Sequence, residues 1–418
     1  MEVKPGYKQT EVGVIPKEWA VNALGKSCDI VTKGTTPTSI GRAFTTSGVA
    51  FLKAESISES GYTIPENVAC IDETTHALLK RSQLKRNDLL ISIAGVLGRV
   101  GLVEESDLPA NTNQALAIVR LSRNSQFERT FVFYALRSPC VSRQIRDINV
   151  QAAQANISLQ DVRDFLLPIP PLPEQRAIAA ALSDVDALLG GLDRLIAKKR
   201  DLKQAVMQQL LTGQTRLPGF SGEWEVKRLG DVGEIRSGGT PSTTQPHFWD
   251  GEVPWCTPTD ITALRGYKYL ITTARTISSA GLQASSAEVI PSRSLIMTSR
   301  ATIGACAINL VPMTTNQGFK NVVPFAQFDV EFLYYLMTTQ EAGLVALCGG
   351  STFLEIGKKQ LSAYEISLPK ERSEQTAIAA VLSDMDAELV ALEARRDKTR
   401  DLTQAMMQEL LTGKTRLL

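Results

Sequence analysis

Two short polar segments of the chain carry side chains that could form hydrogen bonds with a ligand. One segment follows Gly34 and the other follows Gly239, and both are rich in threonine and serine. Lysine and arginine residues stand close to each segment in the sequence. Hydroxyl, ammonium and guanidinium groups of this kind contact base edges in the grooves of DNA. Such side chains are also common on any solvated protein surface. At each position a contact with DNA and an ordinary solvent-exposed role are therefore both possible.

A pair of side-chain amides occurs once in each half of the chain. The pair is Asn113-Gln114 in the first half and Asn316-Gln317 in the second, each preceded by a threonine. A bidentate amide can read adenine, which makes these residues candidates for base recognition. The two halves otherwise differ. Residues that recognise one particular base should therefore not occur in both halves. The pattern therefore favours a framework role, in which the amides brace a loop through side-chain to backbone bonds.

The familiar patterns of catalytic and cofactor-binding residues do not occur in the sequence. It contains neither a G-x-x-x-x-G-K-[ST] phosphate loop nor a G-x-G-x-x-G dinucleotide loop, and no Asn/Asp-Pro-Pro-Tyr/Phe tetrapeptide of an amino-methyltransferase. Its two histidines, His76 and His247, are isolated, and its six cysteines are never at metal-ligand spacing. The sequence predicts a chain without a catalytic site, a cofactor or a metal.

A long internal repeat determines how these segments must be positioned. Residues 174–217 recur at 374–417 without a gap, and well over half of the aligned residues are identical. A fainter repeat precedes this one, because Glu18-Trp19 returns as Glu223-Trp224. Such a long period indicates two domains, each paired with a repeated element, rather than a solenoid. The two tryptophans are predicted to be core anchors.

Each strongly repeated segment is predicted to be a long helix. Apolar residues from Ile178 recur at alternating spacings of four and three, which keeps them on one face. Gly213 and Gly413 are expected to end the two helices. About 38 helical residues would span roughly 57 Å. Gly190-Gly191 should weaken the first helix, and the two helices are expected to pair as an antiparallel coiled coil.

Composition limits the classes of protein that remain. The chain has 418 residues, a hydrophobic content of 43% and a formal net charge of +1. Two or more domains are expected at this length. Neither a membrane span nor an apolar signal segment is evident, and the cysteine pattern favours the reducing cytoplasm.

Several motifs together resemble one protein family. They are Pro-Leu-Pro-Glu-Gln-Arg-Ala-Ile at 171–178, Leu-Leu-Thr-Gly-x-Thr-Arg-Leu at the end of each repeat, Tyr-Lys-Gln-Thr-Glu-Val-Gly at 7–13, Pro-Lys-Glu-Trp at 16–19, and the two Asn-Gln pairs. Over essentially the whole chain they resemble the specificity subunit of type I restriction-modification enzymes. The resemblance implies two target-recognition domains, each reading one half of a bipartite asymmetric DNA site. It also implies that the two long helices set the spacing between them.

The fold that follows is α+β, with two similar target-recognition domains separated by two long antiparallel helices in a cyclic pseudo-twofold arrangement. The predicted segments are recognition domain 1 at 1–167, a central helix at 168–218, recognition domain 2 at 219–368 and a C-terminal helix at 369–418. Short strands are expected near 88–93 and 294–298. The end of the chain should lie near Gln9-Thr10, because the first repeat leads directly into a matching segment.

The resemblance also implies the partners of the chain. These are double-stranded DNA, two methyltransferase (modification) subunits and the restriction (translocase and nuclease) subunits of the full complex. S-adenosylmethionine, ATP and magnesium would belong to those partners, and this chain would be non-catalytic. An exposed face rich in alanine and glutamine is the expected docking surface for the modification subunits. Its candidate residues are Ala205, Gln208, Ala405 and Gln408.

The candidate DNA contacts are polar and basic residues of the two recognition domains. They are Lys33, Thr35, Thr36, Lys53, Ser56 and Arg99 in the first domain, and Arg236, Thr240, Ser242, Thr257, Thr259, Arg265, Lys268 and Arg300 in the second. The near-zero net charge implies weak DNA binding by the chain alone, because phosphate contacts need a basic surface. Two alternatives stay open, namely the specificity component of another restriction system and a non-DNA scaffold with two protein-binding modules.

Overall fold

The computed structural model describes residues 4–150, 156–348 and 354–417 of the chain. It divides into two compact units. Unit 1 comprises Met1–Arg194 and Ala394–Leu418, and unit 2 comprises Leu195–Glu393. Each unit therefore combines one predicted recognition domain with part of both predicted helices. Within the described ranges, no helix is both long enough and apolar enough to cross a membrane.

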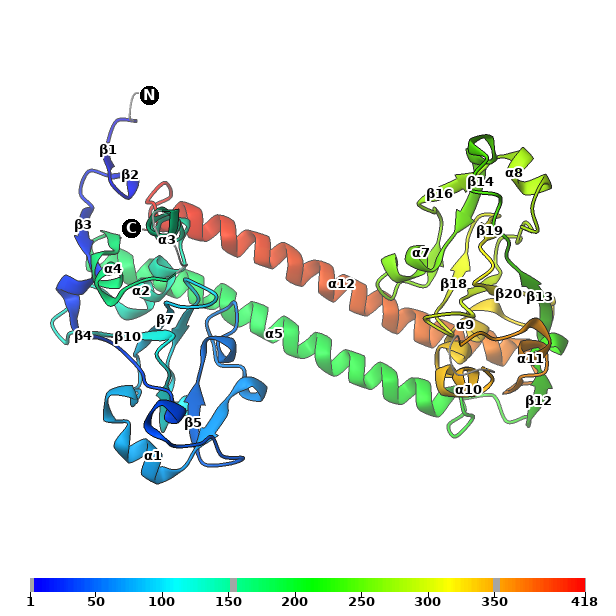
Figure 1. Cartoon of the computed structure of the whole chain (residues 1–418), viewed down its shortest axis with the longest axis horizontal. Coiled ribbons are helices and arrows are strands. Elements are labelled where there is room, and N and C mark those ends of the chain that lie inside the picture. The colour runs from blue at the N-terminus through cyan, green and yellow to red at the C-terminus, as the bar shows by residue number, and fades with distance from the viewer. Residues whose placement is uncertain (1–3, 151–155, 349–353, 418) are drawn as a thin grey trace. The chain divides into compact units, whose positions relative to one another are not determined.

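Unit 1 is built from short strands and short helices around the first part of one long helix (Figure 1). Its strands are β1 (Tyr7–Thr10), β2 (Gly13–Pro16), β3 (Ala20–Ala23), β4 (Cys28–Lys33), β5 (Val49–Leu52), β6 (Ala69–Ile71), β7 (Leu89–Ser92), β8 (Val100–Leu102), β9 (Ala110–Thr112), β10 (Leu116–Leu121) and β11 (Leu166–Ile169). Its α-helices are α1 (Glu73–Leu78), α2 (Arg129–Leu136), α3 (Pro139–Val150), α4 (Leu159–Asp164) and the start of α5 (Leu172–Leu210). Its 3-10 helices are η1 (Leu24–Ser27), η2 (Pro37–Ile40), η3 (Ala54–Ser56), η4 (Pro65–Asn67), η5 (Lys80–Ser82) and η6 (Glu105–Asp107).

Two sheets of unit 1 carry the polar segments. The larger has the order β4-β10-β7-β8, and the smaller has the order β6-β5-β9 with β5 and β9 parallel. The strand expected near 88–93 is confirmed as β7, and all four of its residues are buried. Strands β3 and β11 pair separately, as do β1 and β2. An apolar run such as β7 needs cover on both faces, which the neighbouring helices and the smaller sheet provide.

Unit 2 repeats this plan with different connecting segments. Its strands are β12 (Trp224–Arg228), β13 (Gly233–Ser237), β14 (Trp249–Cys256), β15 (Tyr269–Leu270), β16 (Arg275–Ile277), β17 (Leu295–Met297), β18 (Cys306–Asn309), β19 (Thr314–Thr315), β20 (Lys320–Pro324) and β21 (Glu365–Pro369). Its α-helices are α6 (Leu229–Val232), α7 (Pro258–Ala263), α8 (Ser279–Gln283), α9 (Val330–Thr338), α10 (Glu341–Ala346), α11 (Lys358–Ser362) and the start of α12 (Arg372–Leu410), and its 3-10 helix is η7 (Pro246–Phe248).

The two larger sheets of unit 2 correspond to the two larger sheets of unit 1. The order β13-β20-β17-β18-β15 matches β4-β10-β7-β8 with one added strand, and β16-β14-β19 matches β6-β5-β9. In both small sheets the central strand is parallel to the strand that precedes the Asn-Gln pair. The strand expected near 294–298 is β17. The α+β class with two similar domains is thus confirmed.

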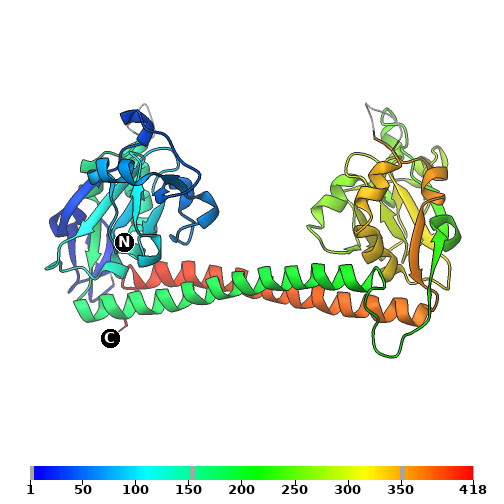
Figure 2. The ribbon, with the colours of Figure 1, turned by 90° about the horizontal axis from the view of Figure 1, so that it is seen from below.

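The two long helices contain 39 residues each, as the repeat predicted. In unit 2 two ion pairs, Lys199–Glu388 and Lys203–Asp386, join α5 to α12. As the residue number increases along α5, the number of its partner in α12 decreases. In unit 1 Asp193 pairs with Arg396, and the start of α5 lies beside the end of α12 (Figure 2). The helices are therefore antiparallel within each unit. Helix α5 continues through Gly190-Gly191 without a break, because tertiary packing outweighs the low helix propensity of glycine.

Each unit has a main apolar core that joins its sheet to both helices. In unit 1 the aromatic residues of α2 pack with Ile178 and Leu182 of α5 and with Leu410 at the end of α12. The corresponding core of unit 2 contains the aromatic residues of α9, Ile378 and Leu382 of α12, and Leu210 of α5. The first apolar residues of each predicted helix stripe, Ile178 and Leu182 in α5 and Ile378 and Leu382 in α12, thus lie in two separate cores. Trp19 is fully buried as expected, whereas Trp224 is half-buried and its indole N–H has no partner in the described structure.

A glutamate and an arginine that recur in both repeats form an ion pair in each unit, between the start of one long helix and the segment that follows the other. In unit 1 the Arg416 guanidinium, beyond the end of α12, donates to both carboxylate oxygens of Glu174 at the start of α5, with Nη2 to Oε2 at 2.8 Å. In unit 2 Arg216 donates to Glu374 in the same way, at 2.6 Å for both bonds. Bidentate pairs of this kind are strong and fix geometry. The repeated Glu and Arg thus join the start of one helix to the end of the other.

The glutamine that follows each of these glutamates forms hydrogen bonds that hold the predicted recognition domain of its unit to the long helix. Gln175 is fully buried, accepts a hydrogen bond from the Glu128 backbone N–H at 2.7 Å and donates to the Pro170 carbonyl at 2.9 Å. Gln375 makes the same contacts with the Asp329 N–H and the Pro369 carbonyl, both at 2.9 Å. The Glu-Gln dipeptide is therefore repeated because it holds each sheet to a helix end.

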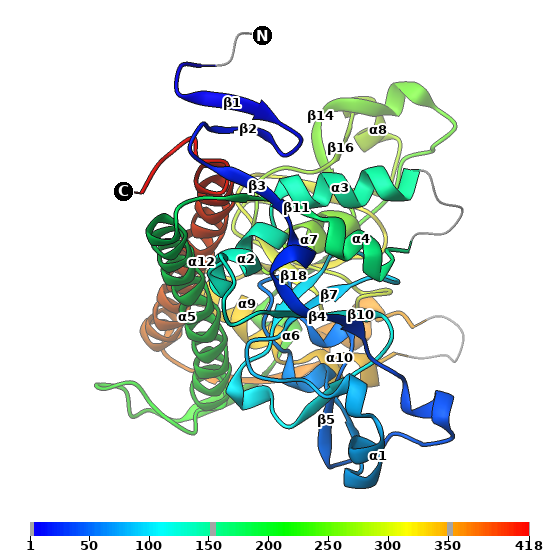
Figure 3. The ribbon, with the colours of Figure 1, turned by 90° about the vertical axis from the view of Figure 1, so that its left-hand side faces the viewer.

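The end of the chain packs against its beginning within unit 1. The Tyr7 hydroxyl donates to the Gly413 carbonyl at 2.9 Å, and Arg416 also pairs with Glu18. Strands β1, β2 and β3 run past the end of α12 (Figure 3). Gly413 has a φ of +67°, and a Cβ there would lie 2.6 Å from the Pro16 ring. The expected proximity of the two chain ends is confirmed, and Gly413 ends α12 because both the turn and the packing require glycine.

Replacing Arg416 by alanine should destabilise unit 1. The change leaves the carboxylate of Glu174, of which only 1% is exposed, with Trp19 as its remaining side-chain partner. Removing one partner of a buried ion pair costs about 3 to 5 kcal/mol. We expect a lower midpoint of thermal unfolding and faster hydrogen exchange in β3 and in the last turn of α12. Lys414→Ala, which removes an exposed cation paired with Glu409, is the control and should have little effect.

Candidate nucleic-acid interface

In each unit the polar segment that begins with glycine is hydrogen-bonded to the segment that contains the Asn-Gln pair. The Gly34 N–H donates to the Asn113 carbonyl at 3.1 Å, and the Gly239 N–H donates to the Thr315 carbonyl at 2.9 Å. A Cβ at Gly34 or at Gly238 would lie 1.9 Å from a carbonyl oxygen of the facing strand. Glycine is therefore needed for this close approach of two backbones. The two segments are named here the Gly34 loop (residues 34–42) and the Gly239 loop (residues 238–245).

The framework interpretation of the amide pairs is confirmed. The Asn113 side-chain oxygen accepts a hydrogen bond from the Ala115 N–H at 3.1 Å, and the Asn316 oxygen accepts one from the Gly318 N–H at 2.9 Å. The neighbouring glutamines accept hydrogen bonds from the hydroxyls of Thr36 and Thr240. Each Asn-Gln pair therefore stabilises its own turn and the adjacent polar loop. Thr36 and Thr240 are held by that framework, with their side chains half-buried.

A basic and polar cluster surrounds the Gly34 loop in unit 1. The Arg81 guanidinium donates to the Thr35 hydroxyl at 3.1 Å, and the Thr35 N–H donates to the Ser82 hydroxyl at 2.8 Å. Lys33, at the end of β4, and Lys80 are exposed. Sequence reasoning identified Lys33, Thr35 and Thr36 but missed Lys80 and Arg81. The only signal for these two was a basic dipeptide, and their position beside the loop depends on a contact across 46 residues.

Two of the candidate contact residues are buried, which is a correction to the sequence-based prediction. Ser56 is fully buried; its hydroxyl accepts from the Lys53 N–H at 3.1 Å and donates to the Asn67 carbonyl at 2.7 Å. It ends a capping box, as Asp260 does at the corresponding place in unit 2. Lys268 is 9% exposed, and its ammonium donates to Glu331 at 2.9 Å and to Ser383 at 2.5 Å. Both side chains hold the fold together and are not available to DNA.

The Lys268 contact has a clear electrostatic effect on its partner. Burial by itself would raise the pKa of Glu331, but hydrogen bonds from Lys268 and Tyr269 lower that pKa to about 2. Glu331 therefore stays ionised at neutral pH and anchors the buried ammonium to helix α9. The carboxylate explains how a lysine can be buried in unit 2, since a buried charge needs a partner.

The other candidates differ in exposure and in their partners. Four use their side chains in contacts within the protein: Arg99 donates to two backbone carbonyls, Arg236 pairs with Glu234, Thr257 bonds Asp260 and Arg300 pairs with Glu355. Lys53 pairs loosely with Glu55 at 3.6 Å. Ser242, Thr259 and Arg265 are exposed. Ser242 belongs to the Gly239 loop, whereas Thr259 lies in α7 and Arg265 just after it, further along the chain than strand β14.

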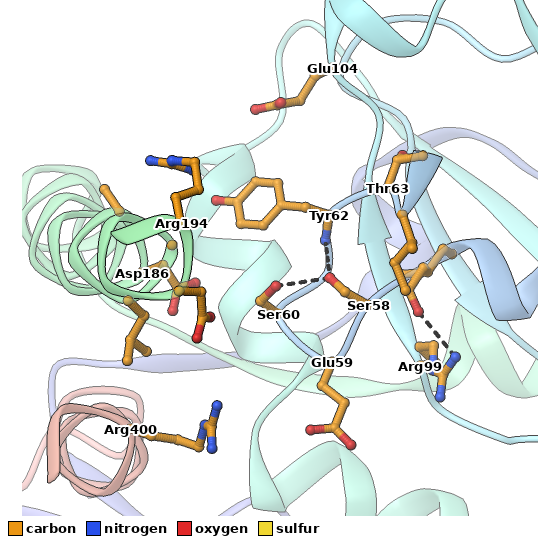
Figure 4. A pocket seen from close by; sticks show the side chains of 16 residues that line it. Ser58, Glu59, Ser60, Tyr62, Thr63, Arg99, Glu104, Asp186, Arg194 and Arg400 are labelled. Atoms are coloured by element: carbon orange, nitrogen blue, oxygen red, sulfur yellow. Dashed lines mark hydrogen bonds between the residues drawn. The ribbon is translucent and has the colours of Figure 1, made fainter. Parts of the chain in front are cut away.

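A cavity of about 870 Å³ separates the loop after β5 from the helices of unit 1. Figure 4 shows Tyr62 directed towards Asp186 and Arg194 of α5, with Arg400 of α12 at one edge. Its lining mixes carboxylates with guanidinium groups. A similar cavity in unit 2, about 950 Å³, is lined by Tyr267, Lys268 and the part of α12 around Asp386. Among the described residues no group of His, Cys, Asp or Glu is arranged to hold a metal ion.

In each unit an aspartate of a long helix lines the cavity and accepts a hydrogen bond from a tyrosine of the predicted recognition domain. The Tyr134 hydroxyl donates to Asp186 at 2.9 Å in unit 1, and the Tyr335 hydroxyl donates to Asp386 at 2.6 Å in unit 2. Burial, together with the neighbouring carboxylate, raises the pKa of both tyrosines above its usual range. The phenols therefore stay protonated and donate hydrogen bonds that position the long helix.

The four docking candidates lie on the long helices with their side chains exposed. Ala205 and Gln208 belong to the part of α5 within unit 2, and Ala405 and Gln408 belong to the part of α12 within unit 1. Gln208 also lines a surface hollow with Arg200, Met207 and Thr338. Corresponding faces of the two helices are thus open in both units.

Known proteins share both the sequence pattern and the fold. Residues 16–197 and 221–399 match the family described as type I restriction modification DNA specificity domain. The type I restriction enzyme MjaIX specificity subunit of Methanocaldococcus jannaschii is 40% identical over 166 residues, which cover 39% of this chain and 38% of that protein. The putative MjaX specificity subunit of the same organism is 23% identical over 98% of this chain and 97% of its own length.

The arrangement of elements is also found in a solved structure. The type I restriction-modification system S subunit from M. genitalium has a TM-score of 0.58 to this chain at 16% identity, covering 98% of both chains. At this level of identity the comparison shows a shared fold.

Proposed function

Because the chain belongs to the family of type I restriction-modification DNA specificity domains, we propose that it is the DNA-reading subunit of such a complex. Unit 1 would read one half of a bipartite asymmetric DNA site, and unit 2 would read the other. The observation that carries the proposal is the repeated frame with unlike loops. The Asn-Gln pairs, the glycine turns and the Glu-Arg pairs recur in both units, while the polar residues around them differ.

The exposed faces of the long helices support the proposed partners. Two modification subunits would dock at Ala205 and Gln208 on α5 and at Ala405 and Gln408 on α12, since both surfaces are exposed and equivalent. Restriction subunits would join this assembly. The net charge of +1 favours such partners, because phosphate contacts supply much of the affinity for DNA and would come from them.

The chemistry of the complex would belong to the partner subunits. S-adenosylmethionine, ATP and magnesium would bind there, and this chain would position the DNA without catalysing a step. All six cysteines are free thiols, which fits the reducing cytoplasm as the place of action.

Exchanging one recognition domain tests this function. Residues 20–167, from the start of β3 into β11, would be replaced by the corresponding residues of the MjaX relative, and the chain would be expressed with its cognate modification subunits. We expect the mapped methylation sites to change in one half-site only, because unit 2 keeps its own loops. A change in both half-sites would contradict the division of labour. Loss of sequence-specific methylation by the unaltered complex would favour the scaffold alternative.

A further inference from the structure

Both units carry an edge-to-face pair of aromatic rings beside the polar loop. In unit 1 the rings of Phe44 and Phe51 lie 5.3 Å apart at 78°, and in unit 2 the rings of Trp249 and Trp255 lie 5.0 Å apart at 84°. Phe51 and Trp255 occupy corresponding places in the central strands β5 and β14. The aromatic pair is therefore part of the shared frame, although the residue types differ.

A cation lies on the outer ring of each pair. The Lys53 ammonium is 4.9 Å from the Phe44 ring centre. The guanidinium carbon of Arg275 is 3.9 Å from the ring centre of Trp249 and 5.3 Å from that of Trp255. The Arg275 contact is the closer of the two, and tryptophan binds cations better than phenylalanine does. Lys53 follows strand β5, whereas Arg275 lies in strand β16, so the similarity lies in the position and not in the sequence.

The two tryptophans connect Arg275 to the Gly239 loop. The Trp255 indole N–H donates to the Gly239 carbonyl at 2.9 Å, and the Trp249 indole N–H donates to the Ser242 carbonyl at 3.1 Å. Both rings are buried, and strand pairing places Arg275 opposite Trp255. The guanidinium therefore lies on a rigid platform whose other edge is the polar loop. Sequence reasoning missed Arg275, because neither tryptophan is near it in the chain.

The hydrogen-bonding edge of Arg275 is free for a ligand. Arg275 is exposed, and within the described part of the chain no carboxylate pairs with it. Three other arginines of unit 2 have such partners, since Arg236 pairs with Glu234, Arg293 with Glu331 and Arg300 with Glu355. Stacking occupies the face of a guanidinium and leaves its N–H groups in the ring plane. Arg275 thus combines a fixed orientation with unused donors.

We propose that Arg275 is a specificity-determining residue of unit 2, which reads the edge of a guanine through two hydrogen bonds. This inference rests on the proposed function of the chain. Guanine O6 and N7 form a pair of acceptors that matches the fork of an arginine, and this is the commonest specific contact in the major groove. A phosphate offers acceptors of similar geometry. The rigid platform favours the base, because reading a base edge requires a fixed direction and a phosphate contact does not.

The difference between the two units agrees with this assignment. Lys53 holds the corresponding position in unit 1, but an ammonium is a compact point charge and lacks the planar fork. It also pairs with Glu55. The same site would therefore read unlike bases in the two half-sites, as an asymmetric target requires.

Methylation mapping of variants tests the role of Arg275. The full complex would be assembled with wild-type chain, Arg275→Ala or Arg275→Lys, and the methylated sites would be sequenced. We expect both variants to accept other bases at one position of the unit 2 half-site, with discrimination reduced roughly 10- to 100-fold there. The unit 1 half-site should be unchanged. Arg228→Ala removes an exposed arginine from β12, in a different sheet, and should leave the motif intact.

Three outcomes would overturn the proposal. If Arg275→Ala lowers methylation equally at all sites and keeps the motif, while Arg275→Lys restores the rate, Arg275 contacts phosphate. If neither variant changes the motif or the rate, Arg275 does not contact DNA. If Arg228→Ala relaxes the same position, the effect is one of general charge. Sequence-specific methylation by the wild-type complex shows in parallel that the proposed function holds, so failure of Arg275 alone is distinguishable from failure of that function.

Discussion

Replacing Ala205 and Gln208 by glutamate is expected to release one modification subunit from the complex without unfolding the chain. Both side chains are exposed on α5, so the new carboxylates are solvated in the free protein. In the docked state they would be buried without partners, which is strongly unfavourable. Light scattering after size exclusion should show one bound modification subunit in place of two. DNA methylation should fall to background, because both half-sites must be held at once.

The internal repeat supplies a matched set of variants for this experiment. Ala405→Glu with Gln408→Glu should release the other modification subunit, and the combination of all four changes should leave the chain without either. Ala205→Ser with Gln208→Asn keeps the surface small and neutral, so assembly should persist. Full assembly of the four-fold glutamate variant would show that the subunits dock elsewhere. A lower midpoint of thermal unfolding would instead point to a structural role of these positions.

Lengthening both long helices by four residues is expected to widen the gap between the half-sites while each half-site stays the same. The insertions would follow Arg194 in α5 and Glu393 in α12, where the chain passes between the two units. Four residues add about 6 Å of helix, which corresponds to one to two base pairs of DNA. The recognition loops are untouched by this change. Sequencing of methylated sites reports the gap and the half-sites in one measurement.

An insertion into α5 alone is the control for this prediction. It would shift α5 against α12 and separate ion pairs such as Lys199–Glu388. That variant should assemble poorly or methylate slowly. If the matched insertion changes the bases that are read, the helices and the recognition loops are not independent. If the gap stays constant, the helices do not set the spacing.

The sequence determined the repeated framework of this protein. Identical residues at 174–217 and 374–417 were sufficient to predict two helices of the observed length, their ends at Gly213 and Gly413, and the proximity of the chain ends. The framework role of the Asn-Gln pairs followed from their presence in two unlike halves. These predictions succeeded because helix periodicity and glycine turns are local properties, and because a duplication repeats whatever holds the frame together.

Tertiary structure alone decided which polar residues are exposed beside the two polar loops and which are buried. Lys268 and Ser56 are residue types that often contact DNA, but tertiary packing buries them against Glu331 and Asn67. Arg275 gave no local signal and Arg81 only that of a basic dipeptide, and contacts between distant segments bring both residues to the polar loops. Gly190-Gly191 should weaken a helix by propensity, yet α5 is continuous because its pairing with α12 outweighs that cost. Exposure and partnership depend on such long-range packing, which a short sequence pattern does not encode.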